Sequence, residues 1–385
     1  MEENEQDTLN TSTFSKSSWD GDENINKIID VHALVEGKEI VEGKHGQKYI
    51  LTDTKTQQKY FAKSLDPTYN AEQQKNQKLE TACCSAMLSC FSHTPYPVGV
   101  RKINNKDFIV FRYDEEDNTK QETNQQIHQY LEDINSTLLN NWAKQNEYIN
   151  FFTSKFQSLP AYGKYYFIQL ITHICFFGLK DRVSNNMLFE KNGMHHIDTD
   201  HDNKFMFDTT SINDLKALYA YYIQILANVN DNNIIQQCQQ YLNKTINKIN
   251  NIDYRKFADR FIRNCMVLGV KEEDAYNYYN TFIKNMLTYV LNTITCIYNT
   301  INKHCNDRNQ NWHTFFNSLF QGLQQMKSNI LQNNNAIKIS QKDWENKYQS
   351  KYNELNKNQP NTSNDDICNS CADKCLSIFR NCCWL

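Results

Sequence analysis

The stretch KYILTDTKTQQKYFAK, from Lys48 to Lys63, predicts two β-strands joined by a turn at Lys55–Gln57. Aliphatic, aromatic and β-branched residues flank a polar centre there, which is the pattern of a β-hairpin. The segment Asn70–Phe91 follows without Pro or Gly, and its apolar residues recur every three or four positions. That spacing predicts a helix with one apolar face. With a further strand expected at Lys106–Tyr113, the region from Asp30 to about Arg112 should hold strands and one helix.

After Gln126 the pattern is mainly helical, and residues 210 to about 350 are expected to be entirely so. Two short extended pieces, Met187–Glu190 and Met194–Asp198, interrupt it around a turn. A β-rich part followed by a long helical part predicts an α+β chain.

Composition narrows the class of protein. The chain has 385 residues, a formal net charge of -3 and 39% hydrophobic residues, with only 10 Gly and 5 Pro. The near-neutral charge argues against a nucleic-acid partner, which requires a basic face. The longest apolar stretch, Tyr165–Leu179, is too short for a membrane span and contains Gln169 and His173, so it predicts a buried helix.

The first residues are acidic and polar, with no secretory signal visible, and residues 1–25 are expected to be disordered. The 13 cysteines therefore indicate a reducing compartment rather than a disulfide framework.

Several residues have the chemistry of a nucleotide site. Lys63 ends the second strand of the early hairpin, a Gly43-Lys-His-Gly46 turn precedes the first strand, and Glu80 lies in the helix that follows. Phosphoryl transfer uses a Lys on the phosphates and a carboxylate that holds this Lys. Each signal alone is weak, because strand lysines are usually solvated and Glu80 would ordinarily be a surface residue.

A second group is more specific. Asp181-Arg-Val-Ser-Asn-Asn186 is followed by His196-Ile-Asp198 at the end of a short expected hairpin. An Asp, an Asn and another Asp would bring oxygen ligands together, and Mg²⁺ prefers oxygen ligands that it shares with phosphates. The alternative is a capped loop that precedes a hairpin.

These motifs resemble the catalytic and metal-binding loops of phosphatidylinositol 3- and 4-kinases, an atypical branch of the protein-kinase-like superfamily. The family pattern is D-R-H-x-x-N followed by H-I-D-F-G. The stretch Leu79–Leu88, with Pro97 and Phe108–Phe111, is also similar to the small lobe of such kinases. The resemblance covers about residues 35–210 and implies a two-lobed protein-kinase-like fold, with a small β-rich lobe, a large helical lobe and a helical C-terminal extension.

The resemblance also implies roles for single residues. Lys63 would bind ATP phosphates and pair with Glu80, under a cover formed by Gly43 and Gly46. Asp181 would orient the acceptor hydroxyl as the catalytic Asp. The remaining roles are an adenine-side hinge at Phe111 to Tyr113 and Mg²⁺ ligands at Asn186, Asp198 and Asp200.

Two positions depart from the family pattern. Val183 replaces the family His, which type II phosphatidylinositol 4-kinases also lack. Thr199-Asp200 replaces the Phe-Gly after the metal Asp, and Asp200 adds a carboxylate for a second cation. The chain is accordingly expected to be a slow kinase, a kinase with an unusual substrate or a pseudokinase.

The same loop also allows a metal centre. His195-His196-Ile-Asp198-Thr-Asp200-His201-Asp202 is rich in ligands for Zn²⁺, Mn²⁺ or Fe, so a metal-dependent hydrolase is a competing hypothesis. It ranks lower because ligands crowded on one hairpin seldom all converge, and because it leaves Lys63 and Asp181 unexplained.

The sequence ends Cys382-Cys383-Trp-Leu385, which fits a CaaX prenylation box and favours a geranylgeranyl group. One prenyl chain anchors only marginally, so acylation of Cys383, Cys375 or Cys371 is the expected second signal. The alternatives are a small packed helix or a zinc cluster. In a bacterium, which lacks this machinery, such a tail would indicate an effector injected into a eukaryotic host and modified there.

The expected organisation is therefore a disordered segment (1–25), a kinase-like N-lobe (26–113), a helical C-lobe with its extension (114–350), and a linker with a lipidated Cys-rich tail (351–385). The preferred function is ATP- and Mg²⁺-dependent phosphoryl transfer to a phosphoinositide at the cytoplasmic face of a membrane, with a protein activator conceivable. A protein kinase and a non-catalytic kinase-like scaffold are the alternatives.

Overall fold

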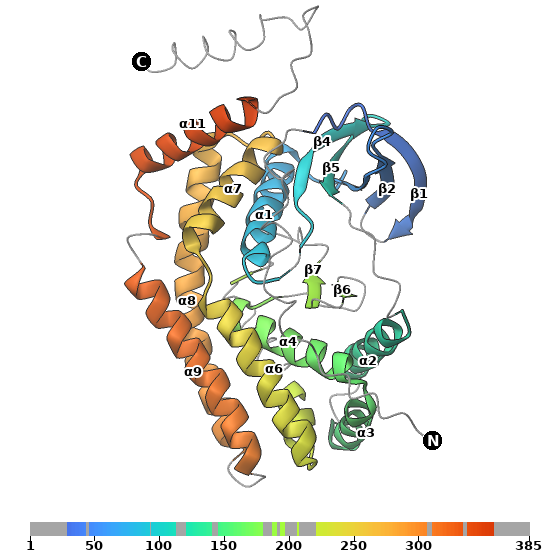
Figure 1. Ribbon diagram of the computed structural model, residues 1–385, viewed down its shortest axis with the longest axis vertical. Coiled ribbons are helices and arrows are strands. Elements are labelled where there is room, and N and C mark those ends of the chain that lie inside the picture. The colour runs from blue at the N-terminus through green and yellow to red at the C-terminus, as the bar shows by residue number, and fades with distance from the viewer. Residues whose placement is uncertain are drawn as a thin grey trace, which may run out of the picture.

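The computed structural model describes residues 29–43, 46–92, 94–112, 121–140, 145–179, 187–190, 193–196, 206–207, 221–305, 310–333 and 337–357. An antiparallel sheet with one helix against it forms one part of the molecule, and a larger helical body forms the rest (Figure 1). The α+β class expected from the sequence is confirmed.

Five antiparallel strands make the main sheet, in the order β1-β2-β3-β5-β4. Their bounds are β1 Val35–Gly43, β2 Gly46–Thr52, β3 Lys59–Ser64, β4 Pro97–Ile103 and β5 Lys106–Arg112. The expected hairpin is confirmed as β2 and β3, and the Asp53 carboxylate closes its turn by accepting hydrogen bonds from the Lys55 backbone (2.9 Å) and the Thr56 hydroxyl (2.8 Å). Strand β4 begins with Pro97 at the edge of the sheet, where the missing N–H costs no ladder bond.

The two faces of the sheet pack differently. Tyr60 and Ala62 in β3 join a small cluster with the N-terminal residues Val31 and Leu34. The opposite face, which includes Ile109 and Phe111 of β5, belongs to the main core.

Helix α1, Ala71–Ser89, shares that main core through Leu79, Ala82 and Cys83. It begins at a capping box in which Asn70 and Gln73 bond reciprocally, each at 2.9 Å. The expected helix is thus confirmed, and it lies on the Ile109 face of the sheet.

The helical body contains α2 Gln121–Asn140, α3 Gln145–Ser158, α4 Ala161–Phe177, α6 Asn232–Asn250, α7 Tyr254–Val267, α8 Glu272–Cys305, α9 Gln310–Gln332 and α11 Gln341–Lys357. As expected for a buried helix, every residue of α4 from Tyr162 to Phe177 is buried. Within the described ranges, no helix combines the length and the hydropathy needed to cross a bilayer. Residues 221–227 form a further helical segment.

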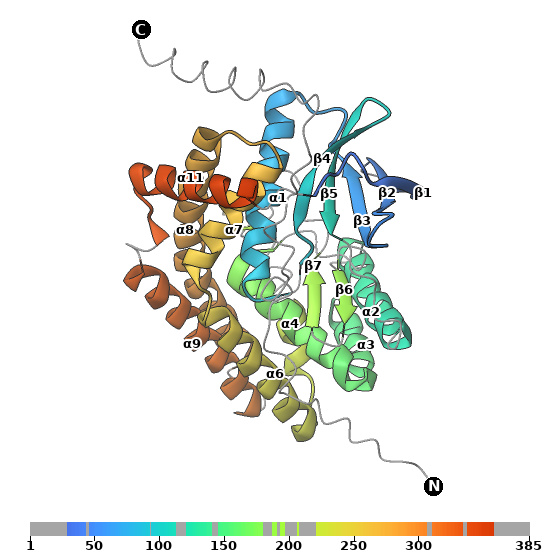
Figure 2. The same ribbon diagram turned by 45° about the horizontal axis from the view of Figure 1, so that its top comes forward.

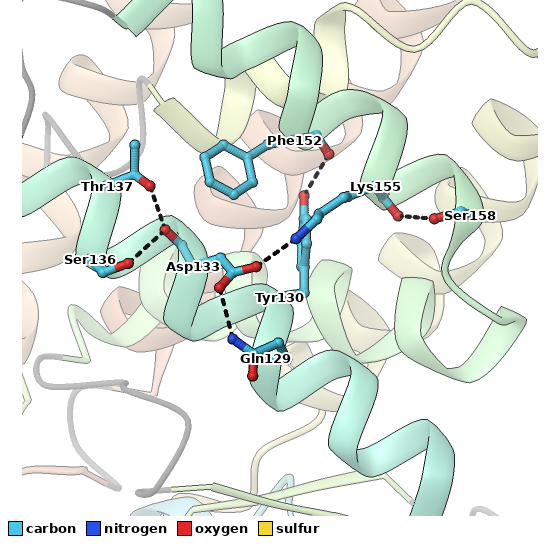
Figure 3. Close-up of polar contacts among 8 residues, drawn as sticks. All are labelled: Gln129, Tyr130, Asp133, Ser136, Thr137, Phe152, Lys155 and Ser158. Carbon is cyan, nitrogen blue, oxygen red and sulfur yellow. Dashed lines mark hydrogen bonds and ion pairs between the residues drawn. The ribbon is translucent and has the colours of Figure 1, made fainter.

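Polar side chains join α2 to α3 (Figure 3). Asp133 accepts from Lys155 at 2.6 Å and from Gln129 at 2.8 Å, and the Tyr130 hydroxyl donates to the Phe152 carbonyl at 3.2 Å. Because the Asp133–Lys155 pair is partly exposed, it contributes only up to about 1 kcal/mol, and it orients α3 more than it stabilises it.

The helical part extends further than expected. Helix α11 continues to Lys357 with Leu355 buried, so the boundary at 350 and the start of the linker at 351 are wrong. Trp344 packs α11 on the helical body, because its ring lies 5.2 Å from Tyr279 and 6.1 Å from Phe261 (centroid to centroid). Helix α11 thus lies against α7 and α8 (Figure 2).

Candidate functional site

Lys63 lies near the end of β3, paired in register with Lys48 of β2 and Ile109 of β5. Strand side chains alternate, so Lys63 shares a face with Phe61, which packs against the main core that contains α1. Only 7% of Lys63 is exposed. Lys63 is therefore not the solvated strand lysine that its type alone would suggest, since an ammonium group is buried only where anionic or polar groups compensate it.

Glu80 lies on α1 and is 2% exposed, so it is not the surface helix residue that its type alone would suggest. Burial, with the nearby Cys84, Cys265 and Glu80, raises the pKa of the Cys83 thiol. Burial, Cys83 and then Glu80 likewise raise the pKa of the Tyr278 phenol. Glu80 therefore lies within electrostatic reach of α8 in the protein interior.

The expected glycine turn and the expected hinge involve strands that flank β3 in the sheet. Gly43 ends β1 and pairs with Gly46, which begins β2, so the two glycines close the β1–β2 hairpin. Phe111 is 9% exposed, pairs with Phe61 and has its ring 6.4 Å from the Phe61 ring. Tyr113, the other expected hinge residue, lies outside the described residues.

The end of α4 sets the start of the expected catalytic loop. Gly178 caps the helix in the left-handed region (φ 63°), and its N–H donates to the Ile174 carbonyl at 2.8 Å. A Cβ on Gly178 would lie 2.6 Å from the Tyr289 ring, which is itself held by hydrogen bonds to the Ile174 and Cys175 carbonyls, both at 3.2 Å. Glycine is thus needed at Gly178 for both conformation and space.

The chain returns to the same place at Phe207. Its N–H donates to the Phe177 carbonyl at 2.9 Å, and its fully buried ring contacts Phe177 (5.8 Å), Phe282 (5.3 Å) and Tyr289 (5.6 Å between centroids). The segment between Leu179 and Met206, which carries all the loop residues singled out above, is therefore tied at both ends to the end of α4.

Within that segment, the expected hairpin is confirmed as β6 Met187–Glu190 and β7 Gly193–His196. The second strand begins one residue before the expected Met194, and its expected end at Asp198 lies outside the described residues. Met187 pairs with His196 at the open end of the hairpin. In the sequence, Asn186 directly precedes this end and Asp198 follows it by two positions.

Several expected site residues lie outside the described residues, namely Asp181, Asn186, Asp198, Asp200, Cys382 and Cys383. The roles assigned to them stay predictions. Among the described residues, no group of three or more His, Cys, Asp or Glu side chains is arranged to hold a metal ion. The competing metal-centre motif also falls largely on residues that are not described.

His173 of α4 is a core residue. Burial, with a smaller effect of the nearby Lys248 ammonium, lowers its pKa to about 3, and its ring lies 4.9 Å from the Phe91 ring. The neutral imidazole is thus the folded-state form over the physiological pH range.

The sequence pointed to the residue types of the site but missed what fixes them. Gly178, Phe207 and Tyr289 hold the ends of the loop segment, and the only signal for them was a Gly directly after an apolar helix. A comparison of the chain with protein-family models and with curated proteins finds no match.

We expect Gly178→Ala to destabilise the protein more than Gly269→Ala does. Both glycines have positive φ, but a Cβ at Gly269 meets nothing within 4 Å, whereas one at Gly178 meets the Tyr289 ring. The control should lose about 1–2 kcal/mol of unfolding free energy from the left-handed backbone alone, and Gly178→Ala clearly more. Urea denaturation of both variants measures the difference, and equal losses would contradict a tight contact at Tyr289.

A second prediction concerns pH. Because the His173 pKa is about 3 in the folded state and near 6.5 when unfolded, the unfolded chain binds the extra proton first as pH falls. The stabilisation from neutral His173 is complete above pH 6.5 and is lost progressively toward pH 3. Between pH 7 and 5, the protein should lose about 2 kcal/mol through this residue.

Urea denaturation at both pH values checks this loss. His173→Gln should remove most of that pH dependence, whereas His32→Gln, at an exposed position, should leave it unchanged. An identical pH dependence in all three proteins would show that His173 is not the group that titrates.

Proposed function

We propose that the protein is an ATP- and Mg²⁺-dependent phosphotransferase that acts at a membrane surface, with a phosphoinositide headgroup as the preferred acceptor. One observation carries the proposal. A buried lysine on the third strand of a five-stranded antiparallel sheet and a buried glutamate on the next helix both face the main core. Protein kinases use a Lys on the third strand and a Glu on the following helix in this way.

The surrounding elements support the same interpretation. The β1–β2 hairpin closes at Gly43 and Gly46, and β5 leads from the sheet toward the helical body. In the sequence the loop segment that carries Asp181, Asn186 and Asp198 follows the core helix α4. The order of parts along the chain therefore matches the order of the kinase motifs that it resembles.

Each residue has a distinct role in the proposed reaction. Lys63 donates to phosphate oxygens, and Glu80 keeps its ammonium group oriented. Asp181 orients the acceptor hydroxyl and accepts its proton, while Asn186, Asp198 and Asp200 offer oxygen ligands. Magnesium, when bound there, neutralises charge on the phosphates. Because Lys63 is withdrawn from water, its charge acts at a lower effective dielectric than a surface lysine would.

The acceptor and the membrane location are inferred from the motif resemblance and from the cysteine-rich segment. Phosphoinositide headgroups carry hydroxyl acceptors and lie at the bilayer surface, where lipid attached at Cys382 and Cys383 would hold the enzyme.

The first test is transfer of phosphate from labelled Mg-ATP to vesicles that contain phosphatidylinositol, or to a panel of proteins. Lys63→Met should lower the rate at least about 100-fold, because it removes a donor that stabilises the transferring group. Asp198→Ala should abolish transfer. Lys59→Met is the matched control, since Lys59 begins the same strand but is exposed, and its rate should stay unchanged.

The outcomes of this assay separate the alternatives. Label on proteins alone would indicate a protein kinase, and ATP binding without transfer would indicate a kinase-like scaffold. Tightly bound transition metal with ATP-independent hydrolysis would indicate a hydrolase. Equal rates for wild type and Lys63→Met would refute the proposed site.

The membrane location has its own test in a eukaryotic cell. Cys382→Ser should move the protein from the membrane fraction to the cytosol, because the prenyl chain attaches there. Cys383→Ser should release it only in part, since it removes just the second signal. If the distribution of Cys382→Ser equals that of wild type, the anchor proposal is wrong.

A further inference from the structure

The face of α7 that turns toward the protein interior carries three polar side chains that the proposed chemistry does not use. Arg260, Arg263 and Asn264 are 9%, 2% and 0% exposed. Burying a guanidinium group costs several kcal/mol unless hydrogen bonds and charges compensate it, so two of them on one short helix indicate a specific purpose. The hydrogen-bond partners of the three side chains identify that purpose.

Two of these side chains bind α1. The Asn264 amide donates to the Ala82 carbonyl in the middle of the helix at 3.0 Å. One Arg260 nitrogen donates to the Ser89 hydroxyl at 3.0 Å and lies 3.8 Å from the Cys90 sulfur. Helix α1 has no basic residue in its last turn, so Arg260 supplies the positive charge that stabilises a helix C-terminus.

Arg263 continues the contact beyond α1. Its guanidinium donates to the Pro97 carbonyl at the start of β4 and to the Asn264 side chain at 3.1 Å, and it lies 5.0 Å from the centre of the Tyr96 ring. The three side chains thus hold the chain from the middle of α1 to the first residue of β4. Figure 1 shows α7 running beside α1.

Helix α11 in turn packs against α7. The Lys347 ammonium of α11 binds the Asp259 carboxylate at 2.7 Å, and the Trp344 ring packs against Phe261. The contacts that support α7 therefore come from the same chain.

We propose that α7 positions Glu80. Arg260 and Asn264 are the positioning residues, and they hold α1 in the place where Glu80 orients Lys63. No activating partner is needed for this. Glu80 lies two positions before Ala82, so a shift of α1 at the Asn264 contact would move Glu80 with it. This inference rests on the proposed function, because Glu80 matters to catalysis only if it holds Lys63.

The test is a double-mutant cycle on the affinity for Mg-ATP, measured by calorimetry with the full-length protein. Arg260→Ala should weaken binding about tenfold, which is within the usual range for coupling between two sites. In a Glu80→Gln background the same change should have little effect, because the group that it positions is already gone. Arg260→Lys should restore most of the affinity, and Arg255→Ala, on the exposed face of α7, should change nothing.

Hydrogen exchange of the α1 amides without nucleotide is the second measurement. Exchange at Leu79–Ser89 should rise in Arg260→Ala and stay at the wild-type level in Arg255→Ala. If Arg260→Ala does not fold, Ser89→Ala removes the same hydrogen bond by a smaller change and should give the same pattern.

These measurements separate the two proposals. Equal weakening of Mg-ATP binding in both backgrounds, or no weakening, would overturn the positioning role while the kinase proposal stands. A wild-type protein that binds no Mg-ATP would refute the proposed function, and the exchange data would still report whether α7 holds α1. Unchanged hydrogen exchange of the α1 amides in both Arg260→Ala and Ser89→Ala would show that α7 does not hold α1.

Discussion

Helix α1 is buried from Leu79 to Ser89 on every side, and this burial constrains the rest of the fold. A helix without a solvent face needs two layers to cover it. The sheet supplies one layer, with β4 in contact with α1, and α7 with α8 supplies the other. The β-rich and helical parts therefore share one continuous core, with α1 at its centre.

This arrangement explains which parts of the fold the sequence could predict. The β2–β3 hairpin and α1 were predictable because their signals are local, namely a polar turn between two strand-like runs and a 3–4 spacing without Pro or Gly. The partner that covers the second face of α1 was not predictable. Periodicity indicates that a face is buried but carries no information about which distant segment buries it, and α7 lies more than 150 positions away in the chain.

The same limit applied to the candidate site. Lys63 and Glu80 have the right residue types, yet a strand lysine and a helix glutamate are usually solvated, and only tertiary packing withdraws these two from water. Strand β4 was not named among the expected strands because it begins with Pro97, a residue that is unusual in strands but tolerated at the start of an edge strand. The loop segment after α4 could be found in the sequence because its polar and acidic residues are concentrated in a short stretch.

Helix α8 connects the two halves of the candidate site. Near its start, Asp274 binds Lys75 of α1 at 2.9 Å, and further along, Tyr289 packs against Gly178 and Phe207 at the base of the loop segment. Asp274 and Tyr289 are fifteen positions apart, which spans roughly 22 Å at 1.5 Å per residue. Because one continuous helix contacts both places, its rigidity fixes the distance between the helix that carries Glu80 and the point from which the loop segment leaves α4. A separation set by one element varies less than one set by two domains joined through a flexible linker.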